Sequence, residues 1–253
     1  MTIVTETVEG VARIEIARPE KKNALTAAMY QQLADALLAA EADPAVRAVL
    51  ICGQPDIFTA GNDLEDFLKN PPQGAGAPVF QFMRALAHAS KPVVAAVNGA
   101  AVGIGTTLLL HCDLVYCADN AMFSMPFVSL GLCPEFASSL LVAQNAGYHK
   151  AAEKLLLGEP ISAEEALEMK IVNRLLPPAE VRAYAQRQAQ RFSALAPSAV
   201  RETKRLLKAP QRAALDAVIE DEARSFGHLL ASTEAKEAFS AFLEKRKPQF
   251  GER

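Results

Sequence analysis

Two short apolar runs constrain the fold of this chain more than any other feature. Arg47–Gly53 (RAVLICG) and Pro92–Val97 (PVVAAV) each carry consecutive apolar residues bounded by turn-forming neighbours. Runs of this length are typical of strands buried in the middle of a sheet. The segments Leu25–Glu41 and Val79–His88 have the apolar spacing of helices, and Thr26 can cap the first of them. This alternation favours an α/β core with helices packed on sheets.

The rest of the chain extends this pattern. Ile3–Val8 and Val11–Ala17 alternate polar and apolar residues around Glu9-Gly10, which predicts a hairpin. Leu114–Ala118 and Met122–Met125 are expected strands, and the chain after Phe136 is expected to be nearly all helix. In this half, Ser162–Glu165 has a capping-box pattern and Ile171–Leu176 is a brief strand. The later helices are expected at Ala179–Ala194, Pro197–Lys208, Arg212–Leu230 and Thr233–Arg246.

Composition excludes several classes of protein. The chain has 253 residues, of which 51% are hydrophobic, and a net charge of −3. This length suits one substantial core, and the nearly balanced charge implies neither a nucleic-acid nor a membrane partner. The N-terminus lacks the pattern of a signal peptide, and polar residues interrupt the longest apolar stretch, Val93–Leu110. We therefore expect a soluble protein.

Cysteine and histidine spacing argue against disulfides and zinc. The cysteines form no CxxC pair, and the histidines form no HxxxH or HExxH pattern. Free thiols in a reduced, cytoplasmic compartment are the simplest interpretation. The cysteines are Cys52, Cys112, Cys117 and Cys133, and the histidines are His88, His111, His149 and His228.

Glu135 is an acidic residue in an almost uncharged stretch, Met122–Leu141. A carboxylate in apolar surroundings tends to have a raised pKa, and such a group can act as a general base near neutral pH. The alternative is a glutamate at a helix N-terminus after Pro134, where the helix dipole favours an acid. This stretch alone does not decide between them.

Two strand-to-helix turns are candidate parts of a site. Phe58–Phe67 (FTAGNDLEDF) and Asn98–Gly105 (NGAAVGIG) both combine small residues with a following helix signal. The first is also explained as an ordinary turn with Asp63 as an N-cap. The second lacks the third glycine and the downstream acid of a dinucleotide fingerprint. Two turns that each release a free N–H suit the binding of an oxyanion, beside which a carboxylate can remove a proton.

The whole chain resembles the crotonase (enoyl-CoA hydratase/isomerase) superfamily. The resemblance is carried by ARPEKKNAL, FTAGNDL, KPVVAAVNGAAVGIGTTLLLHCDLVYCADNAMFSMPF, ISAEEALEMKIVNRLLP and FLEKRKPQF. It implies a ββα spiral core, Met1–Ala194, and a helical oligomerisation region, Leu195–Arg253. The helices of this region pack between subunits in relatives, which implies a homotrimer or hexamer.

The resemblance also implies site residues. Asn62 and Ile104 are expected to supply the two N–H groups of an oxyanion hole. The segment Ala60, Gly61, Asn62, Asp63 and Leu64 is expected to line the adenine and pantetheine path of an acyl-CoA substrate. Lys21 and Lys22 lie on the loop that runs near the CoA nucleotide in relatives, and Phe226 and Lys245 fall where relatives contact CoA.

Two departures indicate the branch of the family. Hydratases of this family activate water with two glutamates, and those positions hold Thr107 and Phe127 here. Glu135 instead matches the LG-x-x-PE pattern of the Δ3,Δ2-enoyl-CoA isomerases, which implies a single acid/base in fatty-acid β-oxidation. Phe127 is expected to keep water from the reacting carbons. No metal or redox cofactor is expected; coenzyme A enters as part of the substrate.

Other functions on this scaffold stay open. A hydratase with relocated residues, a thioesterase and a dehalogenase would all act on an acyl-CoA, and the fold does not choose between them. A non-catalytic acyl-CoA binder or assembly subunit is a further alternative, because both hydratase glutamates are missing.

Overall fold

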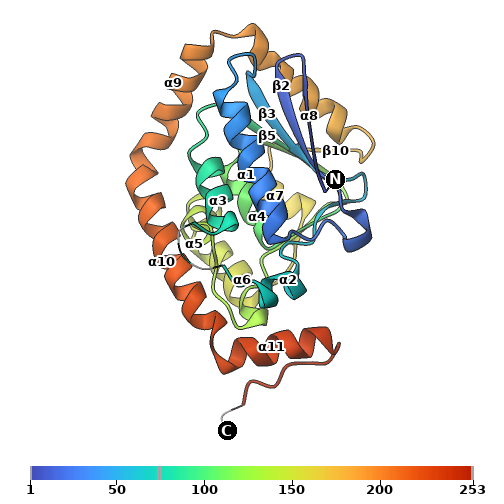
Figure 1. Cartoon of the computed structure of the whole chain (residues 1–253), viewed down its shortest axis with the longest axis vertical. Helices are drawn as coiled ribbons and strands as arrows, with labels where there is room; N and C mark the ends of the chain where they lie inside the picture. The colour runs from blue at the N-terminus through green and yellow to red at the C-terminus, as the bar shows by residue number, and fades with distance from the viewer. Residues whose placement is uncertain (1, 73, 75, 252–253) are drawn as a thin grey trace.

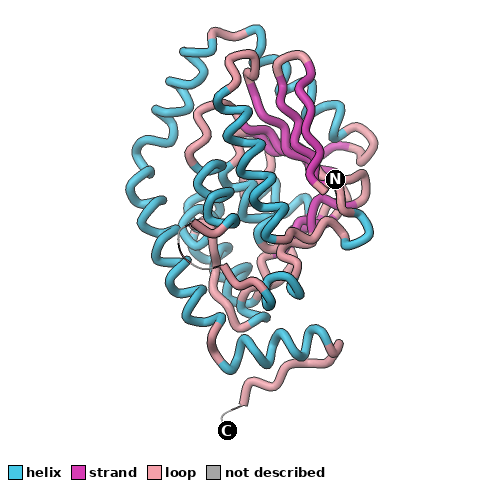
Figure 2. The backbone as a smooth tube through the Cα atoms, viewed as in Figure 1, coloured by secondary structure: helices cyan, strands magenta, loops and turns pink. Residues whose placement is uncertain are grey.

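The computed structural model describes residues 2–72, 74 and 76–251, and it contains two sheets surrounded by helices (Figures 1 and 2). The larger sheet comprises, in spatial order, β1 (Ile3–Val8), β2 (Val11–Ile16), β3 (Ala48–Cys52), β5 (Val93–Val97), β7 (Leu114–Ala118) and β10 (Arg174–Leu176). The smaller sheet comprises β4 (Ile57–Thr59), β6 (Ala100–Val102), β8 (Met122–Ser124) and β9 (Ile161–Ser162). The β1–β2 hairpin and the β8–β9 pair are antiparallel, and the other strand pairs are parallel.

The helices fall close to the predicted positions. They are α1 (Ala27–Ala42), α2 (Leu64–Lys69), α3 (Pro78–Ala87), α4 (Ile104–Thr107), α5 (Ser138–Ala146), α6 (Tyr148–Leu157), α7 (Ala163–Glu168), α8 (Val181–Gln190), α9 (Pro197–Lys208), α10 (Arg212–Leu230) and α11 (Thr233–Leu243). The predicted caps Thr26 and Asp63 accept backbone N–H bonds, and Ser162 with Glu165 forms a complete capping box. These predictions concern local side chains, and the structure confirms them.

Burial explains the order of the elements. Every residue of β3 and β5 is buried, because α1, with α3 packed against it, lies over one face of the larger sheet and α8 packs against the other. A strand of the smaller sheet and then a helix follow each of β3, β5 and β7. This repeated strand–strand–helix unit is the predicted ββα core. The glycine turn in Ala100–His111 leads into a buried helical segment, as predicted, but this segment is only the single turn α4 followed by a 3₁₀ turn, and the short strand β6 before it was not predicted.

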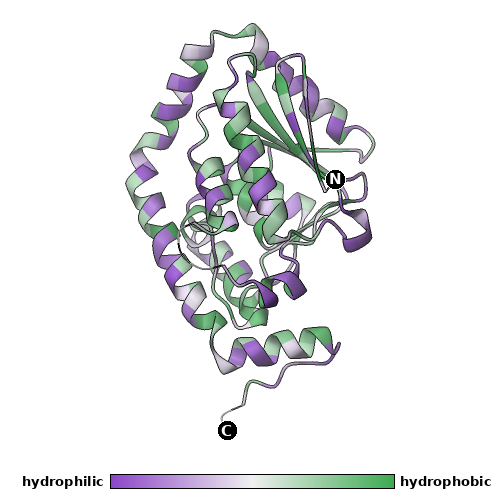
Figure 3. Ribbon diagram, in the orientation of Figure 1, coloured by the Kyte–Doolittle hydropathy of each residue, from purple (hydrophilic) through white to green (hydrophobic). Residues whose placement is uncertain are grey.

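The C-terminal helices lie along the outside of this core. In Figure 1, α9 and α10 run down one side and α11 crosses the end of the molecule. In Figure 3, α9 and α10 are coloured mainly hydrophilic with apolar residues interspersed, and α11 contains a larger share of apolar residues. The residues Leu206, Leu207, Phe242 and Leu243 on these helices are exposed.

Two expectations about this region stay predictions. They are the division of the chain into Met1–Ala194 and Leu195–Arg253, and the trimeric or hexameric assembly. No helix in the described part of the chain has the length and apolar character needed to span a membrane.

Asn23 joins the larger sheet to the strand that leads into the site. Its side chain is fully buried, and its Nδ2 donates to the carbonyl oxygens of Ile16 at 2.9 Å and Phe58 at 3.0 Å. Its Oδ1 accepts from the N–H of Arg18 at 2.7 Å. The backbone of Asn23 has a φ of 56°, a conformation that asparagine tolerates better than most residues. The end of β2 and the end of β4 are therefore held by one side chain.

Replacing Asn23 tests this link. Asn23→Ala leaves two buried carbonyls and one N–H without these partners and puts alanine at a positive φ. We expect a loss of about 2–4 kcal/mol in the free energy of unfolding, measured by urea denaturation. Lys22→Ala is the matched control, because Lys22 has a φ of 51° but an exposed side chain. A loss no larger than that of the control would contradict the role of the Asn23 side chain.

Candidate active site

Two neighbouring parallel strands end side by side at the predicted oxyanion turns. In the register of β4 with β6, Thr59 lies beside Ala101. The turn after β4 contains Gly61, with a φ of 84°, where a Cβ atom would lie 2.6 Å from the carbonyl oxygen of Val102. The turn after β6 contains Gly103, with a φ of 57° and a ψ of −120°. Glycine permits both the close approach and the backbone angles.

The amides of Asn62 and Ile104 are left unpaired by these turns. Neither N–H makes a hydrogen bond with any described part of the chain. Ile104 is the first residue of α4, so its N–H has no carbonyl one turn earlier. Both residues line the same small cavity. The structure therefore brings together the two amides that the sequence singled out.

Hydrogen bonds on both sides fix Asn62. Leu25 donates its N–H to the oxygen of Gly61 at 2.8 Å and accepts the N–H of Asp63 at 2.9 Å. The hydroxyl of Tyr30 in α1 donates to Asn62 Oδ1 at 2.5 Å. Burial raises the pKa of Tyr30 well above its usual value, and the charge of Glu135 raises it further, so this hydroxyl stays protonated and can donate.

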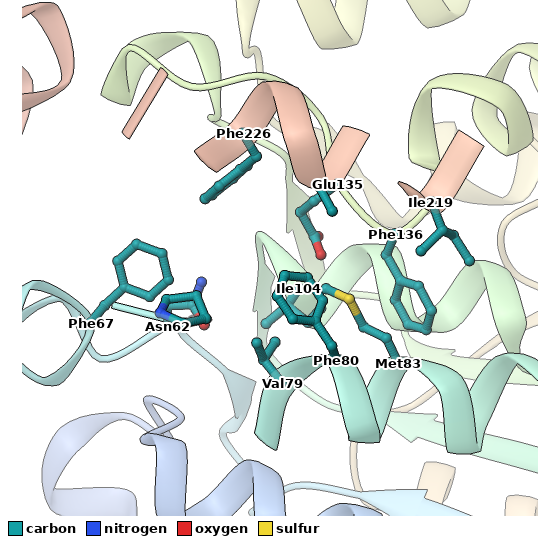
Figure 4. Close-up of a pocket in the computed structure, with 12 residues that line it drawn as sticks. Asn62, Phe67, Val79, Phe80, Met83, Ile104, Glu135, Phe136, Ile219 and Phe226 are labelled. Atoms are coloured by element: carbon teal, nitrogen blue, oxygen red, sulfur yellow. The ribbon is translucent and has the colours of Figure 1, made fainter. Parts of the chain in front are cut away.

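Glu135 enters the same cavity from the opposite side, but not from a helix. The helix expected around it begins only at Ser138, so the helix-N-terminus explanation for Glu135 is wrong. Phe136 and Ala137 have φ values of 57° and 56° and form a left-handed turn between Glu135 and α5. Figure 4 shows the carboxyl group pointing into the pocket toward Ile104, Phe80 and Met83.

One oxygen of Glu135 is bonded and the other is free. The hydroxyl of Thr107 in α4 donates to Oε1. Oε2 is buried and has no hydrogen-bond partner within the described residues. Burial raises the pKa of Glu135 to about 8, although the bond from Thr107 lowers it, and the negative charge of Glu222 adds to the rise. Such a pKa is suited to accepting and returning a proton near neutral pH.

A chain of hollows surrounds the site. The cavity at Glu135 is about 40 Å³, and its described lining contains no other titratable side chain. It shares Asn62, Phe67, Ile104 and Phe226 with a groove of about 550 Å³ that reaches α11. It also shares Asn62, Phe67, Pro72 and Val79 with a hollow of about 420 Å³ between α2 and the start of α3. Two larger hollows thus adjoin the cavity that holds the carboxyl group.

Most of the predicted binding residues lie along the larger groove. Ala60, Gly61, Asn62, Asp63 and Leu64 all line it, as do Lys21 and Phe226. Asp63 also caps α2 and pairs with Arg18 at 2.7 Å. Lys22 and Lys245 are exposed and are not part of the lining of these hollows, so their predicted contact with a nucleotide stays a prediction.

Aromatic rings close the cavity toward the groove. Phe226 of α10 makes edge contacts with Phe67 at 6.2 Å and Phe127 at 6.5 Å between ring centroids. Phe127 is buried and lines the groove rather than the Glu135 cavity. Phe127 therefore does not face Glu135 directly. It packs against Phe226, and Phe226 lies between Phe127 and the Glu135 cavity.

Three contributors to the site were not predicted from the sequence. Thr107 was expected only to replace a glutamate, whereas its hydroxyl donates to Glu135. Tyr30 gave no signal beyond helical spacing. Glu222 of α10 accepts bonds from the turn beside Glu135. Its signal was present, since Glu222 lies on the apolar stripe of Ile219, Ala223 and Phe226.

The four cysteines are free, as predicted, and Cys52 and Cys117 are buried. Burial raises the pKa of Cys52 to about 11 and that of Cys117 to about 12, so these thiols stay protonated at neutral pH. No group of three His, Cys, Asp or Glu side chains within the described ranges is arranged to hold a metal ion.

Comparisons with known proteins show the family and the fold. The family model for enoyl-CoA hydratase/isomerase matches residues 6–253. The structure of Pseudomonas aeruginosa OdaA is similar, with a TM-score of 0.94 and 52% identity, covering 96% of this chain and 98% of that one. The predicted crotonase-type fold is confirmed.

Characterised relatives carry names from two activities. The chain is 33% identical to enoyl-CoA delta isomerase 2 of Homo sapiens, covering 97% of this chain, and it spans 64% of the length of that relative. It is 35% identical to crotonyl-CoA hydratase of Syntrophomonas wolfei, covering 98% of this chain and 97% of that one. The chain belongs to the enoyl-CoA hydratase/isomerase family.

Proposed function

We propose that this enzyme is an acyl-CoA double-bond isomerase that converts a 3-enoyl-CoA to the trans-2-enoyl-CoA in fatty-acid β-oxidation. The observation that carries the proposal is the solitary carboxyl group of Glu135, with one free oxygen, in a cavity that also presents the amides of Asn62 and Ile104. Isomerisation needs one group that takes a proton and gives it back. This cavity offers one such group in its described lining.

The first step is removal of a proton from C2. The thioester oxygen accepts hydrogen bonds from the N–H groups of Asn62 and Ile104. As the C2–H bond breaks, its electron pair moves toward that oxygen and forms an enolate, and the proton goes to Oε2 of Glu135. Loss of one oxyanion donor typically raises a barrier by about 3–4 kcal/mol, so two amides supply a large part of the rate enhancement.

The second step returns the proton to C4. Protonated Glu135 donates it, a C4–H bond forms, and the double bond comes to lie between C2 and C3. No atom is gained or lost in the overall reaction. The aromatic residues Phe67, Phe127 and Phe226 at the mouth of the cavity disfavour entry of water, which would otherwise compete for the enolate or add to the product.

Hydration is the alternative that the relatives' names keep open. Hydratases of this family activate water with two carboxylates, and this chain has Thr107 and Phe127 at those positions. Thr107 is also occupied as a donor to Glu135. Both features favour isomerisation over addition of water. An acyl-CoA in the groove beside Ala60–Leu64, a homotrimeric or hexameric assembly and a cytoplasmic location belong to the same proposal.

Replacement of the carboxyl group tests the proposed base. Glu135→Gln should reduce conversion of 3-hexenoyl-CoA to the conjugated product by at least about 10³-fold, because an amide cannot accept the C2 proton. Acyl-CoA binding, measured by calorimetry, should change little. Glu159→Gln, at an exposed position outside the site, is the control. Full turnover by Glu135→Gln would refute the assignment, and rapid hydration of crotonyl-CoA by the unaltered enzyme would favour the hydratase.

The pH dependence of the reaction follows from the pKa of Glu135. Only the ionised carboxylate removes a proton, and its pKa is about 8 in the free enzyme. We expect kcat/KM to rise about tenfold per pH unit below about pH 8 and then to level off. Measurement between pH 5.5 and pH 9.5 with 3-hexenoyl-CoA tests this. A profile that is flat down to pH 5.5 would show that a group with a lower pKa performs the step.

The same carboxyl group should make the protein less stable at high pH. The pKa of Glu135 rises from 4.5 to about 8 on folding, so the folded chain holds a proton that the unfolded chain releases in this range. The stability that this bound proton contributes to the folded chain is fully present below about pH 4.5 and is lost as the pH rises to about 8. Glu135→Gln removes this loss, so the variant should gain stability relative to the unaltered enzyme from pH 5 to pH 8. Urea denaturation at both values measures the difference, and an equal difference at both would contradict it.

A further inference from the structure

The turn that follows Glu135 requires outside support. Phe136 and Ala137 both have left-handed backbone angles, which cost residues with a Cβ about 1–2 kcal/mol each. The turn is joined directly to Glu135, so its conformation determines where the carboxyl group points. It also precedes α5, whose N-cap residue, Ala137, has no side-chain oxygen to accept the first N–H groups of the helix.

His111 holds one side of this turn. Its Nε2 lies 2.8 Å from the carbonyl oxygen of Phe136, and its ring stacks on the Phe136 ring with centroids 3.7 Å apart. Burial lowers the pKa of His111 to about 3, although the bond to Phe136 opposes this. The imidazole is therefore neutral, and because the carbonyl can only accept, Nε2 carries the hydrogen and donates it.

Glu222 holds the other side from α10, far away in the sequence. One carboxylate oxygen accepts the N–H of Ala137 at 2.5 Å. The other accepts the N–H of Ser139 at 3.0 Å and its hydroxyl at 2.5 Å. Glu222 is only 8% exposed. A serine at position 137 could cap α5 without burying a charge, so capping alone does not account for this arrangement.

The helix that carries Glu222 also forms the wall of the cavity. Ile219, Ala223 and Phe226 lie on the same face of α10 and line the Glu135 cavity. One helix thus sets the position of the wall and, through Glu222, the position of the carboxyl group. Besides burial, Thr107 from α4 and Glu222 from α10 act on the pKa of Glu135. Burial raises the pKa of Glu222 as well, although the bonds from Ser139 and Ala137 lower it. The charge of Glu135 in turn raises the pKa values of Tyr30 and Cys133.

We propose that Glu222, opposite His111, is a positioning residue for the catalytic carboxyl group, because it locks the turn at Phe136–Ala137 so that the free oxygen of Glu135 faces the cavity. This proposal rests on the proposed function of Glu135. It gives the C-terminal helices a part in the chemistry, since removal or displacement of α10 would release the turn as well as open the cavity.

Two variants separate geometry from charge. Glu222→Gln removes the charge and places an NH₂ group or a neutral oxygen against the turn. We expect kcat for 3-hexenoyl-CoA to fall about 10- to 100-fold with little change in KM, and the rising limb of the pH profile to move to lower pH.

Glu222→Asp keeps the charge but is one carbon shorter and cannot reach both Ala137 and Ser139. Its kcat should fall about tenfold with the limb unmoved. Glu220→Gln, exposed on the same helix, should behave as the unaltered enzyme.

The outcomes decide the proposal. The proposal is overturned if folded Glu222→Gln retains full kcat. It is also overturned if this variant loses kcat while the rising limb of its pH profile stays in place, because that is the result expected of a residue that only stabilises the fold. If that variant does not fold, full kcat in Glu222→Asp overturns it. A lack of isomerisation by the unaltered enzyme would instead refute the proposed function. In that case the pKa of Glu135, measured by carbon-13 NMR in the ligand-free protein, still decides: it should be lower in Glu222→Gln, and an unchanged value would contradict the role of Glu222.

Discussion

The hydrogen bond from Thr107 to Glu135, inside a cavity with little access to water, is the interaction on which the rest of this account depends. An ionised carboxylate buried in apolar surroundings is costly, and a single donor offsets only part of that cost. The carboxyl group therefore binds its proton more tightly than an exposed glutamate does. The bond also occupies one oxygen and leaves the other directed into the cavity. A destabilised but oriented group of this kind is what proton transfer at carbon requires.

The fold supplies the other half of the site through strand geometry. Because β4 and β6 are parallel neighbours in the smaller sheet, their carboxyl ends meet at one edge, and the glycines after them leave one amide free on each turn. Asn23 and Tyr30 then fix the first turn to the core. The loop before α5 brings in the carboxyl group from the opposite side, with Glu222 of α10 supporting its turn. The proposed catalytic groups thus come from separate elements, and the bond from Thr107 of α4 links the element of Ile104 to Glu135.

An element of the fold or the site could be predicted from the sequence where the contacts that determine it join residues close together in the chain. The β1–β2 hairpin, β3, β5, the Thr26 cap and the capping box at Ser162 follow from residues close in the sequence, and each was predicted. The start of α5 could not be predicted in this way. Pro134-Glu135 suggests a helix start, but the left-handed turn delays it to Ser138, and the groups that hold this turn lie 25 and 85 residues away. The division of Ala100–His111 into three elements likewise depends on pairing of β6 with β4 and β8. The resemblance to a family located the site residues, whereas burial and hydrogen bonding explain what Thr107 does in place of a glutamate.

In the proposed mechanism, one carboxyl group both removes the C2 proton and delivers it to C4. Conversion of 3-hexenoyl-CoA labelled with deuterium at C2, followed by NMR of the product, tests this most directly. Because the protonated carboxyl group is shielded from solvent, a measurable part of the deuterium should appear at C4 of the trans-2-enoyl product. A product made in ordinary water with no deuterium at C4, or one carrying a hydroxyl at C3, would contradict the account.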